Sequence, residues 1–139
     1  MNFRLYGDGI ALEWQGQHLD LHNSFDFRGF HYHVHAQQVE LTWLRSNEPW
    51  ARDVQIPGLQ LVFKQVAYFA VKARAPEYPF TENKCLANIS FHRPEERGEF
   101  DSISLEALSD DDLTFYFQSE WGLKVNAKTV ELFPYDTSR

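Results

Sequence analysis

Apolar residues recur at every second position in one stretch near the end of the chain, and this alternation constrains the fold more than any other feature. The alternating positions are Leu113, Phe115, Phe117, Leu123, Val125 and Ala127. A β-strand with one buried face requires this period of two. Residues 119–122 form a turn that ends on glycine, which favours a hairpin. We expect Phe117 to face Val125 and Phe115 to face Ala127 across it.

Two earlier stretches show the same alternation. Residues 10–21 predict a hairpin around Gly16, because glycine readily adopts the positive φ that a two-residue turn needs. Residues 26–45 predict another hairpin, in which a four-residue turn over 35–38 keeps the apolar side chains on one face. No glycine or asparagine marks this second turn, so its register is inferred from parity alone.

The rest of the chain fits short strands joined by turns. Further strands are expected over residues 59–63, 68–72, 85–91 and 103–107. Gln65–Arg74 also follows a helical spacing, so one short helix is the alternative there. Strands that recur every 8–12 residues or so are typical of antiparallel sandwiches and barrels. We predict a single all-β domain over residues 1–139, either a meander-rich sandwich or a partly open barrel.

The charge balance excludes two classes of partner. The chain has 13 Lys and Arg residues against 20 Asp and Glu residues, a net charge of −7. Nucleic acids and anionic membrane surfaces are bound through neutralised phosphates and head groups, so neither is expected as a partner. The sequence has one cysteine, no visible signal peptide and no apolar run of about 18 residues. We therefore expect a cytoplasmic protein.

The segment 31–35, His-Tyr-His-Val-His, is the richest in metal-binding side chains. In a strand its three imidazoles point to one face. The register inferred above places Glu40 opposite His33 and Thr42 opposite His31. His31, His33 and Glu40 would then form a ligand set suited to a divalent transition metal such as Zn, Fe, Ni or Cu.

The order His-x-His-x-x-x-x-Glu, formed by His33, His35 and Glu40, resembles the first metal motif of the cupins, which are small β-barrels. The resemblance implies a metal-dependent enzyme that uses His31, His33 and Glu40, assisted by His35 or His92. The glycine spacing departs from the cupin pattern, and the Pro-x-Gly-x-x-His segment is missing. The alternative is that these polar residues are the solvent face of a hairpin.

Carboxylates crowd one window of the sequence, in which Arg97 is the only base. They are Glu95, Glu96, Glu99, Asp101, Glu106, Asp110, Asp111 and Asp112. Gathered at one end of a sheet, they would form a negative surface that attracts a basic protein. All except Glu106, together with Trp50 in the 45–58 loop, make up the predicted partner-binding surface. The alternatives are solvated turns for the carboxylates and a tryptophan that pins its loop to the core.

These features favour a non-catalytic protein-binding domain with an acidic surface. The sequence contains no phosphate loop, nucleophile elbow or Cys-x-x-Cys pair, so we assign no catalytic residue. In composition the chain resembles some bacterial immunity proteins, which implies an inhibitor that masks a basic active site; an accessory subunit is equally consistent. The alternatives are the cupin-like metal enzyme and a β-barrel that holds a small apolar ligand, suggested by 12 Phe, 6 Tyr and 4 Trp.

Overall fold

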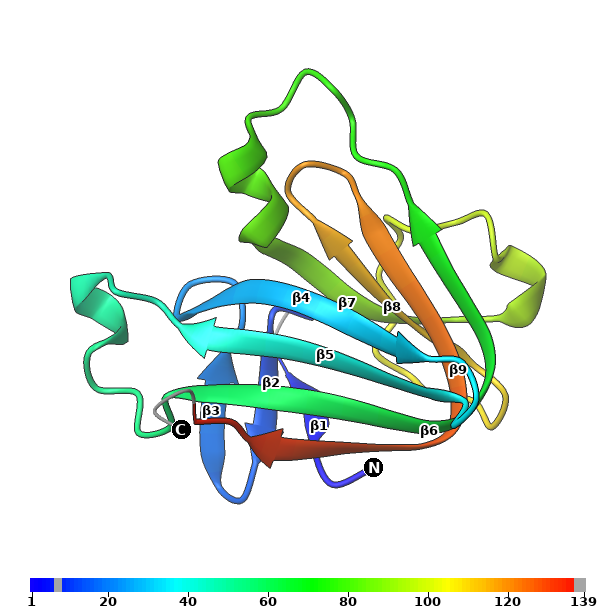
Figure 1. Cartoon of the computed structure of the whole chain (residues 1–139), viewed down its shortest axis with the longest axis horizontal. Coiled ribbons are helices and arrows are strands. Elements are labelled where there is room, and N and C mark those ends of the chain that lie inside the picture. Colours follow the sequence, from blue (N-terminus) through cyan, green and yellow to red (C-terminus); the bar gives the residue numbers. More distant parts are fainter. Residues whose placement is uncertain (7–8, 137–139) are drawn as a thin grey trace.

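The computed structural model describes residues 1–6 and 9–136, which form two antiparallel sheets (Figure 1). The small sheet has the order β1-β2-β3, with β1 (Arg4–Tyr6), β2 (Ala11–Trp14) and β3 (Gln17–Asp20). The large sheet has the order β4-β5-β6-β9-β8-β7, with β4 (Phe25–His33), β5 (Gln38–Arg45), β6 (Gly58–Lys72), β7 (Leu86–His92), β8 (Asp112–Phe117) and β9 (Gly122–Pro134). It curls into a half-barrel, which confirms the all-β prediction and the partly open barrel.

The helical content differs from the prediction. The described residues contain three short 3-10 helices, η1 (Pro49–Ala51), η2 (Phe80–Lys84) and η3 (Pro94–Glu96), all in connections between strands. The helical alternative for Gln65–Arg74 is wrong, because β6 continues as a strand to Lys72 and pairs with β9 on both sides of a bulge. Gln65, with φ of 55°, precedes this bulge, which lies between Val66 and Tyr68. Bulges bend strands and increase their twist, as the curl of this sheet requires.

Apolar side chains of both sheets share one core. Leu12 and Leu19 of the small sheet belong to the same buried cluster as the rings on the inner face of the half-barrel. Those rings are Phe25, Phe27, Trp43, Phe63, Phe115 and Phe117. Trp43 lies among them, with its ring centroid 4.8 Å from that of Phe27 and 5.8 Å from that of Phe115. The small sheet therefore closes one part of the half-barrel.

The first predicted hairpin is confirmed, whereas the second is offset along the strand. Gln15 and Gly16 form a two-residue turn with φ of 49° and 74°. In the second hairpin His31 pairs with Glu40, where Thr42 was expected, because the turn comprises residues 34–37. The offset is an even number of residues, so each side chain keeps its predicted face.

In the hairpin of β8 and β9 the side chains also lie on their predicted faces, but the pairing register differs from the predicted one. Phe115 pairs with Leu123, not with Ala127 as the sequence suggested. The connection is a three-residue loop that ends on Glu120, which adopts a φ of 69°, and the Phe117 N–H donates to Trp121 O at 3.0 Å. Loops of this kind need one residue with a positive φ, in the left-handed backbone conformation. Here that residue is Glu120, although Gly122 is only two residues further on.

The strand predicted over residues 103–107 is wrong. This segment has no regular structure, and its apolar side chains are exposed, among them Ile103 at 54% and Leu105 at 40%. One backbone bond ties it to the sheet, donated by the Phe91 N–H to Ser104 O at 2.8 Å. The segment therefore lies along the edge of β7 through this backbone bond, and its alternating apolar side chains face solvent.

Candidate functional site

One edge of the large sheet is covered and the other is open. At the β7 edge, the N–H groups of Ile89 and Phe91 donate to backbone carbonyls outside the sheet at 2.6 and 2.8 Å. At the opposite edge, the backbone of residues 25–33 makes no further backbone hydrogen bond within the described chain beyond its ladder with β5. The β4 edge, defined as the side of residues 29–33 away from β5, therefore offers unpaired N–H and C=O groups to another strand.

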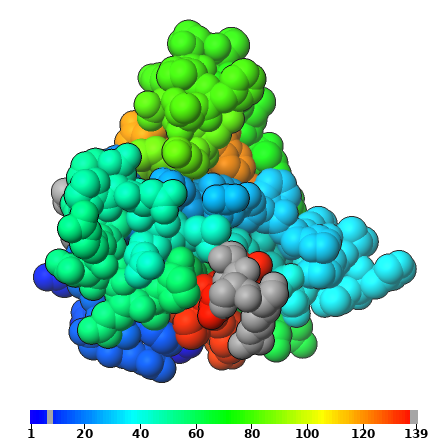
Figure 2. Space-filling model, turned by 60° about the vertical axis from the view of Figure 1, so that its left-hand side comes forward, coloured from blue at the N-terminus to red at the C-terminus, as the bar shows by residue number. Residues whose placement is uncertain are grey.

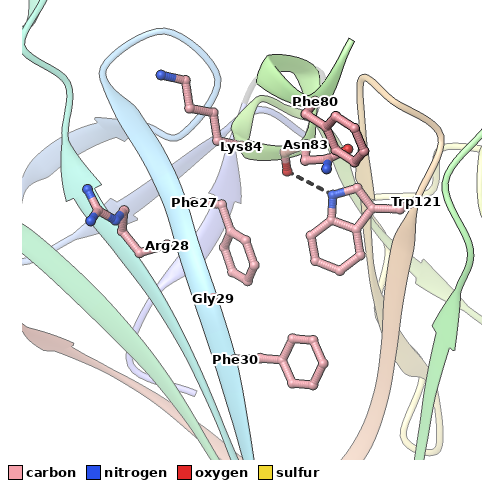
Figure 3. Close-up of a pocket in the computed structure, with 8 residues that line it drawn as sticks. All are labelled: Phe27, Arg28, Gly29, Phe30, Phe80, Asn83, Lys84 and Trp121. Atoms are coloured by element: carbon pink, nitrogen blue, oxygen red, sulfur yellow. Dashed lines mark hydrogen bonds between the residues drawn. The ribbon is translucent and has the colours of Figure 1, made fainter. Parts of the chain in front are cut away.

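An aromatic pocket of about 410 Å³ opens beside the β4 edge (Figure 3). It is lined by Phe27, Arg28, Gly29, Phe30, Phe80, Asn83, Lys84 and Trp121. The rings of Phe27 and Phe30 point from β4 toward Trp121, whereas Arg28 leaves the opposite face of the strand. Four aromatic rings with a few polar groups around them are typical of a pocket that takes an apolar group.

The far wall of the aromatic pocket is held in place by internal contacts. The Trp121 ring stacks on Phe117 with a centroid distance of 4.3 Å and an interplanar angle of 9°. Its indole N–H donates to Asn83 O, in η2, at 2.8 Å. The wall is therefore rigid before anything binds, so little conformational freedom is lost when the pocket is filled.

Apolar side chains continue from the pocket along β4. A bulge between Phe27 and Gly29 keeps Phe27 and Phe30 on the same face of the strand. Phe30 and Tyr32 face the inside of the half-barrel but remain 42% and 40% exposed, and both rings contact Phe69 of β6. The space-filling view shows the β4–β5 hairpin and the η2 segment projecting from the body of the protein (Figure 2). An exposed apolar row of this kind is typical of an interaction site.

The structure brings the three predicted metal ligands together, on the outer face of the same hairpin. His31 lies opposite Glu40 in the ladder, and the rings of His31 and His33 stack with centroids 4.0 Å apart. His33 Nε2 lies 2.5 Å from Glu40 Oε1. One ligand atom from each of these residues lies within 4.8 Å of the others. We call His31, His33 and Glu40 the imidazole cluster.

The two histidines named as possible assistants lie outside this cluster. His35 is exposed in the turn between β4 and β5. His92 is buried at the end of β7, with Nε2 2.8 Å from Ser102 O and Nδ1 2.9 Å from Thr114 Oγ1. His92 therefore holds the connection after β7 against the sheet, and it is not placed to reach a metal bound at the hairpin.

The predicted acidic surface divides into exposed and internal residues. Glu95, Glu96, Glu99, Asp101 and Asp110 are exposed. The Asp111 carboxylate accepts a hydrogen bond from Arg93 at 3.1 Å, and the Asp112 side chain is fully buried against Arg97. Asp112 thus contributes no exposed charge to a partner.

Trp50 is not part of this acidic region. It lies in η1, at the opposite side of the molecule from η3 (Figure 1). Its indole N–H donates to Asn23 O at 2.6 Å, while 64% of the residue remains exposed. The hydrogen bond fixes the loop and the ring still faces solvent, so the role of Trp50 in binding a partner stays a prediction.

A buried lysine anchors the acidic segment, residues 93–112, to the sheet. Lys124 of β9 is fully buried, and its ammonium donates to the backbone carbonyls of Glu96, at 3.1 Å, and Glu99. Burial lowers the pKa of Lys124, and the nearby carboxylates of Asp112, Glu99 and Glu96 oppose that shift. The hydrogen bonds of the buried Lys124 ammonium therefore hold the acidic segment against β9, a strand that is otherwise largely apolar.

Cys85 and His22 are close together but do not form a nucleophile and its base. His22 Nδ1 lies 2.6 Å from Leu86 O and 3.6 Å from Cys85 Sγ. Since a carbonyl oxygen only accepts, Nδ1 carries the proton and cannot take one from the thiol. Burial, followed by the charges of Glu82 and other carboxylates, raises the pKa of the Cys85 thiol. A thiol in such surroundings is a poor nucleophile.

Comparison with protein-family models, with curated proteins and with solved structures gives no match to this chain. Among the described residues, no helix has the length and apolar character needed to cross a lipid bilayer. The function is therefore inferred from the residues of the site and their geometry.

Proposed function

We propose that this protein is a non-catalytic binding domain that recognises an extended segment of a basic protein. The segment adds as a further strand to the β4 edge and places an apolar side chain in the aromatic pocket. The observation that carries the proposal is the contrast between the two sheet edges: β7 has backbone hydrogen-bond partners from outside the sheet, whereas within residues 1–6 and 9–136 the backbone of β4 forms backbone hydrogen bonds with β5 alone. Native proteins usually cover or blunt an edge that has no partner.

A protein segment fits this site better than a small apolar ligand. A small molecule would fill the aromatic pocket, but it would leave the backbone groups of the β4 edge unpaired. It would also leave Tyr32 and Val34 exposed, since these residues continue the apolar row beyond the pocket lining. An added strand pairs the backbone groups and presents every second side chain to the apolar row.

The charge distribution supports a basic partner. The acidic segment contains eight carboxylates and two arginines, a net −6 of the −7 that the whole chain carries. Both arginines make ion pairs within the segment, Arg93 with Asp111 and Arg97 with Asp112. The exposed carboxylates left over would raise the encounter rate with a basic protein. An inhibitor of the immunity type or an accessory subunit in the cytoplasm would both use such a surface.

The test is a selection of peptides from a random display library on the immobilised full chain. We expect the enriched peptides to alternate apolar residues with others and to carry Lys or Arg. Affinity for the tightest peptide should fall at least about tenfold in Phe30→Ala or Phe80→Ala, as for a side chain at the centre of an interface. Both residues are exposed enough for the variants to fold. Isothermal titration calorimetry measures the change.

Trp50→Ala is the matched control, since Trp50 is an exposed aromatic residue that belongs neither to the lining of the aromatic pocket nor to the β4 edge. Its affinity for the peptide should stay within about twofold of the original protein, as for surface substitutions in general. A library that yields no enriched peptide would contradict the proposal, as would peptides that bind Phe30→Ala undiminished. Binding of an apolar dye alone, with quenching of Trp121 fluorescence, would favour the small-ligand alternative.

A further inference from the structure

We propose that the imidazole cluster binds one divalent transition-metal ion of the Zn²⁺ class. This site lies on the outer face of the β4–β5 hairpin, and the proposed strand addition uses the edge and the inner face, so neither inference rests on the other. The three side chains come from two paired strands: His31 and His33 are two residues apart on β4, and Glu40 lies opposite on β5. Residues two apart on a strand share a face.

The distances suit a metal after small side-chain movements. A tetrahedral site with metal–ligand bonds near 2.0–2.1 Å keeps its ligand atoms about 3.4 Å apart. Here the three ligand atoms lie within 4.8 Å of one another, and the shortest separation, His33 Nε2 to Glu40 Oε1, is 2.5 Å. A metal ion would replace this hydrogen bond and draw His31 inward. The His31 side chain is exposed and those of His33 and Glu40 are half-buried, so each has room to change rotamer while the paired backbone stays in place.

The donor set selects the class of metal. Two imidazole nitrogens and one carboxylate oxygen suit Zn²⁺, Ni²⁺ or Cu²⁺, whereas Mg²⁺ and Ca²⁺ prefer all-oxygen sites. Three protein ligands leave a fourth position open. Beside the cluster lies a cleft of about 350 Å³, whose lining includes His31 and Glu40 together with Thr42, Gln60 and Tyr135. Water or a small polar molecule in this cleft is placed to take the fourth position.

The experiment titrates tag-free full-length protein, first treated with a chelator, with ZnCl₂ in a calorimeter. We expect one equivalent to bind, and His31→Ala, His33→Ala and Glu40→Gln each to weaken binding at least about tenfold. His35→Ala is the matched control, because His35 is an exposed imidazole of the same hairpin outside the cluster. Its affinity should stay within about twofold of the original protein, as for substitutions away from a site.

Co²⁺ provides a second readout, since tetrahedral coordination gives intense visible absorption that the His33→Ala protein should lack. Circular dichroism of each variant checks that the fold is retained. The proposal would be overturned if the original protein did not bind Zn²⁺, or if His33→Ala bound it as tightly as the original protein. It would also be overturned if His35→Ala lost as much Zn²⁺ affinity as His33→Ala. Peptide selection with and without chelator tests strand addition separately, so either inference can fail while the other stands.

Discussion

Replacing Asp112 with alanine is expected to lower the free energy of unfolding by about 3 kcal/mol, the lower end of the range for breaking a buried ion pair. The Asp112 side chain is fully buried and accepts hydrogen bonds from Arg97 at 3.0 and 3.2 Å and from Asn126 at 2.8 Å. The lower end of that range applies because the Arg97 side chain is 36% exposed, so water can solvate its guanidinium when the Asp112 carboxylate is removed. Lys124 would also lose a nearby opposite charge.

Urea unfolding followed by circular dichroism measures this change. Asp110→Ala is the control, because Asp110 is an exposed neighbour of Asp112. Its backbone carbonyl accepts a hydrogen bond from Asn126, and this bond is kept when the side chain is removed. The stability of Asp110→Ala should lie within about 0.5 kcal/mol of the original protein. A loss below about 1 kcal/mol in Asp112→Ala would mean that the acidic segment is not fastened through this carboxylate.

Trp43→Ala is expected to lower the free energy of unfolding by about 3–5 kcal/mol, the usual cost of removing a large buried ring. Trp43 is fully buried on β5, and its ring contacts Phe27 and Phe115, which lie on strands that flank it from two sides of the curled sheet. A cavity at this point would separate the β4 side of the half-barrel from the β8 side. Thermal or urea unfolding measures the loss.

The comparison variant is Trp50→Ala, which removes the same side chain from an exposed position. It loses one hydrogen bond to Asn23 O and little apolar contact, so the expected cost is below about 1.5 kcal/mol. Equal losses in the two variants would contradict the placement of the core. They would indicate that the inner face of β5 is not the centre of the packing.

The sequence was informative about which face each side chain takes. Alternation placed Phe115 and Phe117 on the inner face and His31 and His33 on the outer face of their strands, because side chains alternate strictly along a strand. Register was harder, since it depends on the turn. The register of the hairpin around Gly16 was predicted correctly, whereas the turn over 119–122 misled because Glu120, not Gly122, adopts the positive φ there.

The imidazole cluster was predicted from the sequence despite an incorrect register. An even offset moved Glu40 from a position opposite His33 to one opposite His31. Because both histidines lie on the same face and their rings stack, the carboxylate stays within reach of each. The carboxylates of the acidic segment gave no sign of which would be buried, since Asn126, which donates to the buried Asp112 together with Arg97, lies outside their window.

The aromatic pocket could not be assembled from the sequence. Phe30, Phe80 and Trp121 come from a strand, a connection and a hairpin loop far apart in the chain, and only the curl of the sheet brings them together. The available signal was the high aromatic content, 16% of the residues. A high aromatic content is expected of a filled core as well as of a pocket, so it does not say which rings are exposed.

The central claim is that a partner segment pairs with the β4 edge through its backbone, and an N-methyl scan of the selected peptide tests it most directly. Each backbone N–H of the peptide is methylated in turn, and affinity for the full chain is measured. An added strand directs alternate N–H groups toward the edge, so we predict strong losses at every second position and small ones between. Equal losses at neighbouring positions, or none at all, would contradict strand addition.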